Sequence, residues 1–576
     1  MGENMSTNLS KIKRDKMLET ISKIKENIED DETLKNLSLI EYELTKKKYG
    51  LVWEEHEERV DEELKTQIPT FEEVKEKDII SNKYEKFNFL LEGDNLHSLY
   101  LLEKTHKGKI DVIYIDPPYN TGGEDFMYDD SIVEKEDEFK HSKWISFMKK
   151  RLDIAKKLLK EDGVIFISIG SDEVAQLKMI CDDEIFGYKN LLGMITRRTK
   201  TTSFRGKYFA PRTDYILCYA KDINNIGNFI DEVDESQYKK IEKEGNRVGE
   251  RYRDDTAYYL STLETRPNQR YYIECPDGEL VVPPGKALLS NPTDGEKVIP
   301  ENGDGVWRWE CEQYKLKKNL LVFKKTNKSP LINQNGEKAS WNIYTKVYLN
   351  DKKENGNIPQ ELLLDFINRA GTKELKDLDL EFSFPKPSSL IKALIKYTNK
   401  SSDITVLDFF AGSGTTAQAV LNLNLEDNGK RKFILCTNNE NKICENITYN
   451  RILRLSKGYR KQKPLGGNLK YYKTKYIPRI NTEEENIQEN LLVDIKNLIQ
   501  LENGINIDDK RIRVILSEEE IDKFSEDTEE IKECEKLYIS SDILLTAKQV
   551  KTFKDNNIEV FIIPEYYFDE EIKEVQ

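Results

Sequence analysis

Continuous runs of β-forming residues are separated by helical segments in two distant parts of the chain. The runs are apolar at nearly every position, which is typical of strands buried on both faces of a parallel sheet. Four such runs lie at residues 111–115, 163–169, 404–409 and 432–437. Residues 144–159 have the spacing of an amphipathic helix, and another helix is expected from Thr415 onward. We therefore predict an α/β fold with a doubly wound, Rossmann-like sheet.

The alternation of strands and helices stops between residues 200 and 380, where turn signals recur at 283–285, 302–305 and 335–336. Acidic residues concentrate before residue 80 and after residue 482. The chain should therefore form several domains. We predict a helical arm (1–80), a first half of the sheet (81–222), an inserted domain (223–380), a second half of the sheet (381–480) and an acidic α/β region (481–576). In the last region, strands are expected near residues 511–516, 543–545 and 559–564.

The loop after the first run reads Asp116-Pro117-Pro118-Tyr119. Open α/β sheets place their ligand sites at the carboxyl ends of strands, and two prolines make such a loop stiff. The Asp116 carboxylate and the Pro117 carbonyl could then accept both hydrogens of one exocyclic amino group, while Tyr119 offers a ring for stacking. This pattern favours modification of the amine of a flipped-out nucleobase. The alternative is an ordinary junction between a strand and a turn.

A glycine-rich turn, Phe410-Ala411-Gly412-Ser413-Gly414, follows the run 404–409. It lacks the third glycine of the dinucleotide fingerprint and the Gly-Lys-Ser/Thr of a P-loop. A strand, Asp408 and the pattern F-x-G-x-G fit instead an S-adenosylmethionine site, with the helix N-terminus favouring an anionic group. Glu440, after the run 432–437, is a candidate for the ribose hydroxyls. Another nucleotide site or a plain tight turn remains open from this motif alone.

Together the two motifs resemble the amino-methylating DNA methyltransferases. The catalytic motif precedes the cofactor motif, which resembles the permuted (β) class, where a target-recognition insert separates the two. Several blocks between about residues 45 and 460 are similar to the modification (Mod) subunits of type III restriction–modification systems and their solitary relatives. These blocks are YGLVWEEHEE (49–58), LLEGDNLHSL (90–99), DPPYNTGGEDFMYDD (116–130), HSKWISFMKKRL (141–152), DGVIFISI (162–169), FPKPSSLI (384–391) and CTNNENKICENITYNRI (436–452). One departure is Gly170-Ser171-Asp172-Glu173, where relatives often have Asp-Asp-Asn-Glu.

This resemblance implies a Rossmann-like methyltransferase sheet with its catalytic half at 81–222, a target-recognition domain at 223–380 and its cofactor half at 381–480. It implies transfer of a methyl group from S-adenosylmethionine to N6 of adenine in duplex DNA by a bacterial, cytoplasmic, nucleoid-associated homodimer. A separate restriction (helicase–nuclease) subunit is an implied partner, since no P-loop or helicase motif occurs here. The implied catalytic residues are Asp116, Pro117, Pro118 and Tyr119. The implied cofactor residues are Asn120, Lys386, Asp408, Phe409, Phe410, Ala411, Gly412, Ser413, Gly414, Thr415 and Glu440.

Composition narrows the class of protein. No run approaches eighteen apolar residues, so we expect no membrane span, and the polar N-terminus does not read as a signal peptide. The seven cysteines are scattered without a C-x-x-C pair, and the four histidines show no ligand spacing. We therefore expect a chain from a reducing compartment with no metal site.

The net charge of −15 is unexpected for a DNA-binding protein, but the distribution matters more than the sum. Residues 193–213 and 447–482 contain no acid and many basic residues, the second segment interleaved with tyrosines. Such segments can neutralise phosphates, although solvated surface is the alternative. In the first segment we predict DNA contacts from Arg197, Arg198, Lys200, Arg205 and Lys207.

Four other functions stay open at this point. Family members acting on cytosine N4 more often carry Ser in place of the Asp, so adenine is favoured by resemblance, with cytosine N4 as the alternative. Related tetrapeptides also serve RNA methyltransferases, although the permuted order and the long insert argue against RNA. The third alternative is a catalytically idle DNA-binding protein, against which the intact motifs argue. The fourth is a fused restriction enzyme, against which the lack of a P-loop and of a recognisable helicase motif argues.

Overall fold

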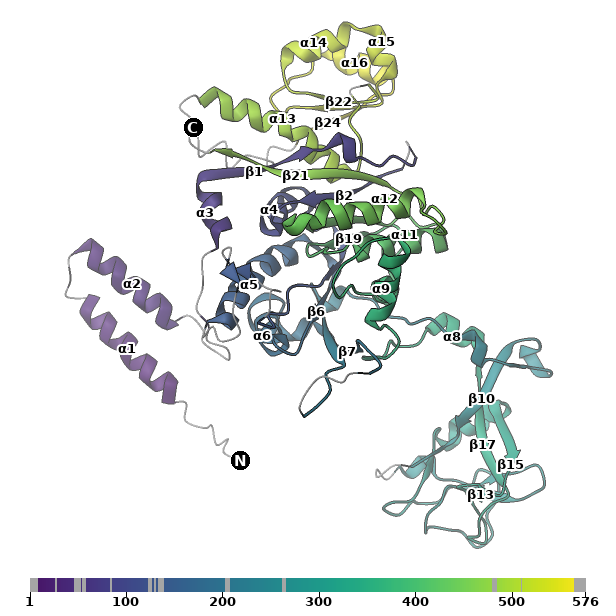
Figure 1. Cartoon of the computed structure of the whole chain (residues 1–576). Coiled ribbons are helices and arrows are strands. Elements are labelled where there is room, and N and C mark those ends of the chain that lie inside the picture. Colours follow the sequence, from purple (N-terminus) through teal and green to yellow (C-terminus); the bar gives the residue numbers. More distant parts are fainter. Residues whose placement is uncertain are drawn as a thin grey trace. The chain divides into compact units, whose positions relative to one another are not determined.

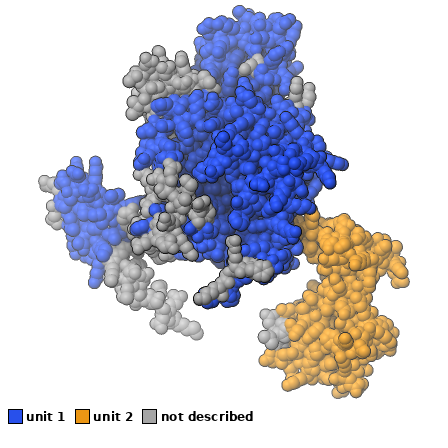
Figure 2. All heavy atoms as spheres, in the orientation of Figure 1, with its two compact units in different colours: residues 1–227, 360–576 blue, residues 228–359 orange. Residues whose placement is uncertain are grey.

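The computed structural model describes residues 9–25, 28, 30–45, 53, 58–82, 85–122, 127–128, 131–132, 139–202, 208–261, 266–478, 484–508 and 510–563. These residues belong to two compact units. One comprises residues 1–227 and 360–576, and the other comprises residues 228–359 (Figure 2).

The first unit is built on a ten-stranded mixed sheet, visible through the middle of Figure 1. In spatial order its strands are β1 (Gln67–Glu73), β21 (Asn468–Pro478), β2 (Phe87–Glu92), β20 (Lys432–Thr437), β19 (Thr405–Asp408), β3 (Ile110–Ile115), β6 (Leu159–Ile169), β8 (Thr213–Ala220), β7 (Leu191–Arg198) and β18 (Leu362–Leu363). The strands from β21 to β6 run parallel, whereas β1 pairs antiparallel with β21 and β8 pairs antiparallel with β6. The predicted α/β class and Rossmann-like sheet are confirmed.

The winding reverses between β19 and β3, which are hydrogen-bonded neighbours. From β19 the chain passes through α11 (Thr415–Asp427) to β20 on one side. From β3 it passes through α5 (Lys140–Leu158) to β6 on the opposite side. A crevice for ligands is expected at the carboxyl ends of two strands that separate in this way.

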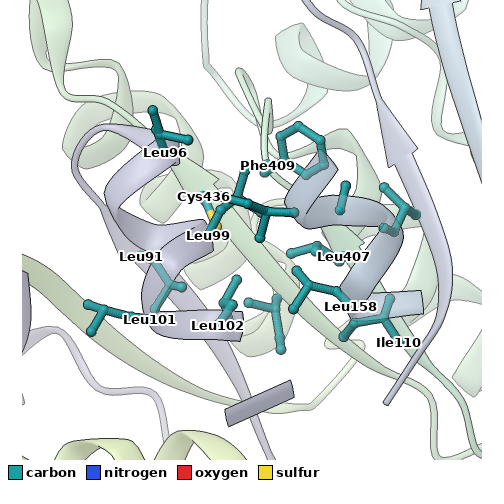
Figure 3. Packing of buried hydrophobic residues seen from close by; sticks show 14 of the residues in the cluster. Leu91, Leu96, Leu99, Leu101, Leu102, Ile110, Leu158, Leu407, Phe409 and Cys436 are labelled. Carbon is teal, nitrogen blue, oxygen red and sulfur yellow. The ribbon is translucent and has the colours of Figure 1, made fainter. Parts of the chain in front are cut away.

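Helices bury both faces of the sheet. On one face α4 (Asn95–His106), α5 and α13 (Glu484–Asn503) contribute to a continuous core, in which Leu99 and Leu102 pack near Leu407 of β19 and Leu158 of α5 (Figure 3). Val406 of β19 is fully buried but lies outside that core, as expected for alternate residues of a strand. On the other face α10 (Ser388–Tyr397) packs on α11, and α12 (Asn450–Lys457) also contacts α11.

Two predicted region boundaries differ from the structure. The predicted helical arm over residues 1–80 contains α1 (Leu9–Lys25), α2 (Asp31–Thr45) and α3 (Arg59–Thr66), but β1 then joins the main sheet. The predicted insert over residues 223–380 extends too far, because β18 and α9 (Asn368–Asp377) belong to the first unit. In each case a short strand, β1 or β18, pairs with a strand far away in the sequence.

The second unit, residues 228–359, has an antiparallel four-stranded sheet in the order β15 (Leu321–Lys325), β17 (Trp341–Tyr348), β10 (Arg251–Ala257) and β9 (Lys240–Ile241). A smaller sheet joins β12 (Ile273–Glu274), β13 (Leu280–Val282) and β16 (Ile332–Asn333). Its aromatic core includes Tyr258, Tyr271, Trp307 and Trp341. The unit therefore has a hydrophobic core of its own.

The C-terminal region forms a small parallel sheet of β22 (Ile512–Ile515), β23 (Lys536–Ile539) and β24 (Glu559–Ile562). The helices α14 (Glu518–Glu526), α15 (Thr528–Glu533) and α16 (Ala547–Asp555) complete it. The predicted strands near 511–516 and 559–564 are confirmed. The strand predicted at 543–545 is wrong, and β23 takes its place in the sheet.

No helix among the residues that the structure describes combines the length and apolar character needed to cross a membrane. Within the same ranges, no cluster of three or more His, Cys, Asp or Glu side chains is arranged to hold a metal ion.

Candidate active site

The Asp116–Tyr119 loop leaves the sheet at the reversal point, directly after β3. All six residues of β3 are buried, so the strand is a rigid base for the loop. Trp144 of α5 donates a hydrogen bond from Nε1 to the Pro118 carbonyl at 2.8 Å. The next residue, Asn120, is fully buried with a φ of 56° and donates from Nδ2 to Glu173 Oε1 at 2.5 Å. The loop is thus held by hydrogen bonds at its second proline and at the residue that follows Tyr119.

Lys386, from the segment between α9 and α10, reaches the two polar side chains of this loop. Its Nζ lies 2.6 Å from both oxygens of Asp116 and donates to the Tyr119 hydroxyl at 2.9 Å. Lys386 was predicted to bind the cofactor, and its described contacts are instead with the candidate catalytic tetrapeptide. The sequence block FPKPSSLI pointed to this segment, but only the fold shows what its lysine contacts.

The Tyr119 ring lies tightly against the end of β6. A Cβ atom added to Gly170 would stand 2.7 Å from Tyr119 Cδ2, so a larger residue there requires the ring or the backbone to shift. The Tyr119 hydroxyl also lies 3.4 Å from Asp214 Oδ2 on β8, to which it donates. Gly170 therefore lies directly against a catalytic candidate.

Arg197 does not occupy the place that the sequence predicted for it. Its side chain is fully buried and donates to both oxygens of Asp214, at 2.8 and 2.5 Å, and to the Phe366 carbonyl at 2.8 Å. A guanidinium with no exposed surface cannot contact a DNA phosphate, so that prediction is wrong. Asp214 also accepts a hydrogen bond from the Tyr119 hydroxyl, so Arg197 fixes the position of a residue that contacts the candidate site.

The other predicted DNA contacts stay predictions. Arg198 donates from Nε to the Leu364 carbonyl at 2.8 Å, whereas Lys200 is exposed. Arg205 and Lys207 lie outside the described residues.

The glycine-rich turn follows β19, the strand next to β3. Asp408 is fully buried and accepts from the Phe410 backbone N–H at 3.0 Å and from Thr416 Oγ1 at 2.5 Å. Burial raises the pKa of Asp408 to about 7, and the charge of Asp116 adds to this shift. The two acidic residues therefore lie close enough to affect each other, as expected for motifs on neighbouring strands.

Gly412 and Gly414 both have positive φ values, +47° and +75°, and Gly414 caps the start of α11. This is the left-handed region, which favours glycine. The loop backbone thus passes the end of the sheet without side chains at two positions and can approach a ligand closely. Residues of these types fit the adenosyl cofactor predicted from the sequence.

The remaining predicted cofactor residues divide into two groups. The hydroxyls of Ser413 and Thr415 accept hydrogen bonds from buried Arg451, at 3.1 and 3.0 Å, so they shape the loop. The Phe409 side chain belongs to the hydrophobic core, and Ala411 is buried. Phe410 is half-buried, and Glu440 is exposed just after β20. Phe410 and Glu440 are therefore the side chains of this set with surface left for a ligand.

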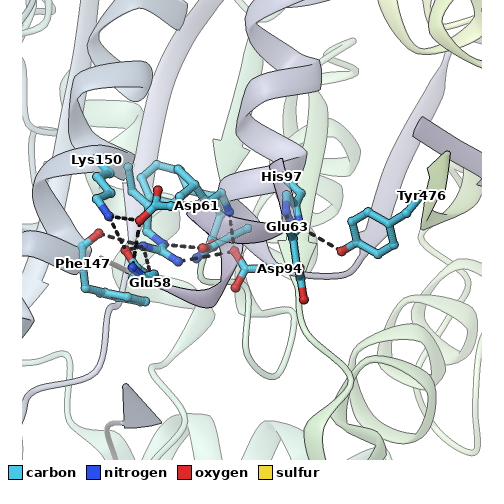
Figure 4. Close-up of polar contacts among 12 residues, drawn as sticks. Glu58, Asp61, Glu63, Asp94, His97, Phe147, Lys150 and Tyr476 are labelled. Carbon is cyan, nitrogen blue, oxygen red and sulfur yellow. Dashed lines mark hydrogen bonds and ion pairs between the residues drawn. The ribbon is translucent and has the colours of Figure 1, made fainter. Parts of the chain in front are cut away.

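A polar network that the sequence reasoning missed reaches the carbonyl of Phe409, directly before the turn, and its members Glu58, Asp94 and Phe147 are labelled in Figure 4. Asn95 donates from Nδ2 to the Phe409 carbonyl at 2.8 Å and accepts from Arg151 Nε at 2.5 Å. Arg151 also contacts Glu58 at 3.0 Å and Asp94 at 3.3 Å, and its guanidinium lies 3.7 Å from the centre of the Phe147 ring. Phe147 in turn lies 5.8 Å from Phe410, ring centre to ring centre. The blocks YGLVWEEHEE, LLEGDNLHSL and HSKWISFMKKRL contain Glu58, Asp94, Asn95, Phe147 and Arg151 and were the signal for them.

Glu173 gives the site a testable pH dependence. It is fully buried at the start of α6 (Val174–Ile180), and His141 Nδ1 lies 2.7 Å from its Oε1. Burial raises the pKa of Glu173 to about 8 from an ordinary value of 4.5. A raised acid pKa favours the protonated folded state, so this contribution to stability is lost as pH rises from about 4.5 to about 8.

We expect Glu173→Gln to remove this part of the pH dependence. Relative to the variant, the unfolding free energy of the wild type should fall by about 4 kcal/mol between pH 5 and 8.5, because each of the roughly three pH units up to the raised pKa of about 8 contributes 1.36 kcal/mol. Denaturant unfolding of both proteins across that range measures the difference. A constant difference would mean that Glu173 does not titrate there. Glu161→Gln, an exposed acid on β6, is the control.

Comparisons with known proteins agree with this geometry. Residues 110–450 match the family model N6_N4_Mtase, described as DNA methylase. The chain is 31% identical over 423 residues to the type III restriction-modification enzyme StyLTI Mod subunit of Salmonella typhimurium, covering 64% of this chain and 56% of that protein. It is 33% identical over 393 residues to the EcoPI Mod subunit of Escherichia phage P1, covering 61% and 58%. The type II methyltransferase M.KpnI of Klebsiella pneumoniae is 33% identical over 361 residues, covering 60% and 79%. The chain thus spans a little over half the length of the two type III relatives.

Proposed function

Because the chain belongs to the N6/N4 DNA methylase family, we propose that it transfers a methyl group from S-adenosylmethionine to N6 of a flipped-out adenine in duplex DNA. The observation that carries this proposal is the meeting of the Asp116–Tyr119 loop and the glycine-rich turn at the reversal point of the sheet. Motifs 294 residues apart in the chain (410 − 116) are brought to one edge of the sheet.

The proposed chemistry follows from the weakness of an aromatic amine as a nucleophile. The N6 lone pair is delocalised into the adenine ring. Asp116 and the Pro117 carbonyl accept the two amine hydrogens, favour a tetrahedral nitrogen and free the lone pair. Tyr119 stacks on the extruded base, which returns roughly 1–3 kcal/mol of the few kcal/mol that flipping costs. Alignment of the amine can supply roughly 7–11 kcal/mol of the barrier.

S-adenosylmethionine, bound along the glycine-rich turn, supplies an electrophilic methyl group on sulfonium. Gly412 and Gly414 allow close approach of the backbone, Phe410 borders the turn, and Glu440 would accept hydrogen bonds from the ribose hydroxyls. The electron pair of the new N–C bond comes from N6, the methyl–sulfur bond breaks with its electron pair left on the sulfur as a neutral thioether, and N6 then loses a proton. No cysteine nucleophile is needed, in contrast to methylation of a ring carbon, and all seven cysteines are buried.

We further propose that the chain acts as the modification subunit of a type III restriction–modification system, in the bacterial cytoplasm. Two of the relatives named above are Mod subunits of such systems. By this proposal it forms a homodimer, works with a separate restriction subunit and reads its target through the second unit, residues 228–359.

The test is incubation of the purified chain with labelled S-adenosylmethionine and either duplex DNA or ribosomal RNA, followed by digestion to nucleosides. We expect N6-methyladenosine from duplex DNA only. N4-methylcytosine in the DNA, or label in the RNA only, would replace the proposal by one of the alternatives. No transfer to any nucleic acid would contradict it.

DNA binding by the basic segment 193–213 gives a separate prediction. Replacing Lys200, Arg205 and Lys207 by Gln should weaken cognate and scrambled duplexes alike, because these cations would contact phosphates. It should also flatten the plot of log K against log salt by about 0.9 for each phosphate that the variant no longer neutralises. A salt titration of binding measures both effects. Loss of site preference with an unchanged slope would mean that the segment reads bases.

A matched control removes three exposed lysines from α16, which are Lys548, Lys551 and Lys554. It changes the net charge by the same amount in the C-terminal region, and the salt slope should remain that of the wild type.

A further inference from the structure

The Lys386 side chain contacts both polar side chains of the Asp116–Tyr119 loop. Its ammonium has three N–H donors, and three acceptor atoms lie within hydrogen-bond distance, namely both oxygens of Asp116 and the hydroxyl of Tyr119. The side chain of Lys386 is only 8% exposed. A buried ammonium that is saturated by two side chains of one loop fixes the position of both.

The backbone that carries Lys386 is clamped by α9. A Cβ atom added to Gly371 of α9 would stand 2.6 Å from the Lys386 carbonyl oxygen, so helix and segment touch directly. Ser388 donates from its backbone N–H and its hydroxyl to Glu374 of α9, at 3.1 and 2.9 Å. The lysine therefore extends from a fixed point.

The same clamp leads to the glycine-rich turn. Glu374 accepts from Arg451 at 3.1 Å, and Arg451 donates to the carbonyl and hydroxyl of Ser413. Through these contacts the turn proposed to hold the cofactor and the loop proposed to hold the target base share one rigid support. Transfer depends on alignment between the two, to which small displacements are costly.

The far side of Tyr119 is fixed as well. Burial and the charge of Asp116 raise the pKa of Tyr119 well above its usual value, so its hydroxyl stays protonated. It can accept from Lys386 while donating to Asp214, which Arg197 holds in turn. The ring that would stack on the base is therefore held at its hydroxyl end from two directions.

We propose that Lys386 is a positioning residue for the methyl transfer, which aims the Asp116 carboxylate and fixes the Tyr119 ring, and that it does not bind the cofactor. The inference rests on the proposed function. An ionised carboxylate offers about four acceptor positions, and Lys386 uses one on each oxygen, which leaves positions for the target amine. The lysine and the amine can therefore bind Asp116 together.

The test compares Lys386→Met with the wild type and with Lys392→Met. Lys392 lies on α10 and pairs with Glu426, away from the loop. We expect Lys386→Met to lower kcat at least about 100-fold, with the dissociation constant for S-adenosylmethionine within about threefold of the wild type. Lys392→Met should leave both quantities unchanged. Normal kcat in Lys386→Met, or a loss of cofactor affinity as large as the loss of kcat, would overturn the inference.

Chemical rescue separates positioning from a structural effect. In Lys386→Ala the missing atoms correspond to n-propylammonium, and adding this cation should raise the kcat of the variant at least about tenfold. Tetramethylammonium, which has no N–H donors, should leave kcat unchanged. Equal effects of the two cations, or no effect of either, would overturn the inference.

Melting temperatures test the contact between Lys386 and Asp116 even if one of the single variants folds poorly. Lys386→Met and Asp116→Asn each leave a charged partner unpaired, so the double variant should melt at a higher temperature than the sum of the two single shifts gives. Additive shifts would overturn the pairing. A wild type that methylates no nucleic acid refutes the proposed function itself, whereas an active wild type with an equally active Lys386→Met refutes only this inference.

Discussion

Asp116→Ala is expected to abolish methyl transfer. Asp116 would accept a hydrogen from the target amine in the transition state, and removal of one preorganised hydrogen-bonding group costs roughly 10²–10³-fold in rate. The affinity for S-adenosylmethionine should stay within a few-fold of the wild type, because Asp116 would contact the amine and not the sulfonium. Single-turnover transfer and a cofactor titration measure the two quantities.

The matched control for this variant is Asp162→Ala, which removes an exposed carboxylate that pairs with Lys400. It should transfer methyl groups at the wild-type rate. Since Asp116→Ala leaves buried Lys386 without its carboxylate, its melting temperature should be measured in parallel. A folded Asp116→Ala protein with full activity would contradict the proposed mechanism.

Gly412→Val is expected to eliminate binding of S-adenosylmethionine. Gly412 has a φ of +47°, which β-branched residues avoid at a cost of about 1–3 kcal/mol. The nearest protein atom to an added Cβ is Phe382 Cζ at 3.6 Å, so the protein itself leaves space there. The loss should therefore come from the changed backbone and from the side chain in the space proposed for the ligand. Isothermal titration calorimetry gives the affinity.

Gly108→Val is the matched control, because Gly108 has a φ of +65° and no atom within 4 Å of an added Cβ. It should suffer similar strain but bind the cofactor normally. Glu440→Ala should weaken binding moderately, because the ribose hydroxyls would no longer have their carboxylate acceptor. Wild-type affinity in both Gly412→Val and Glu440→Ala would place the cofactor elsewhere on the chain.

The sequence was sufficient for the central sheet and the two loops. The run 432–437 coincides with β20, and the run 111–115 lacks only the first residue of β3. Strands buried on both faces have a continuous apolar pattern that does not depend on which strand lies beside them. The position of the two motifs at the ends of such strands then followed from the rules for open α/β sheets.

The sequence did not predict the placement of side chains whose partners lie on a distant part of the chain. Arg197 reads as part of a basic segment, yet it stands opposite Asp214 in the register of β7 and β8, and the two form a buried ion pair. The sequence shows neither that pairing nor the contact between Lys386 and Asp116, which are 270 residues apart. A run of basic residues therefore predicts which cations are exposed only when the pairing of the strands is also known.

The most direct test of the account is sequencing of methylated bases in the genome of the source organism. Three strains are compared, with the gene intact, with the gene deleted, and with the deletion complemented by the Asp116→Ala allele. We expect N6-methyladenine at one recognition sequence in the first strain and its loss at that sequence in the other two. Methylation that persists without the gene, or that the Asp116→Ala allele restores, would contradict it.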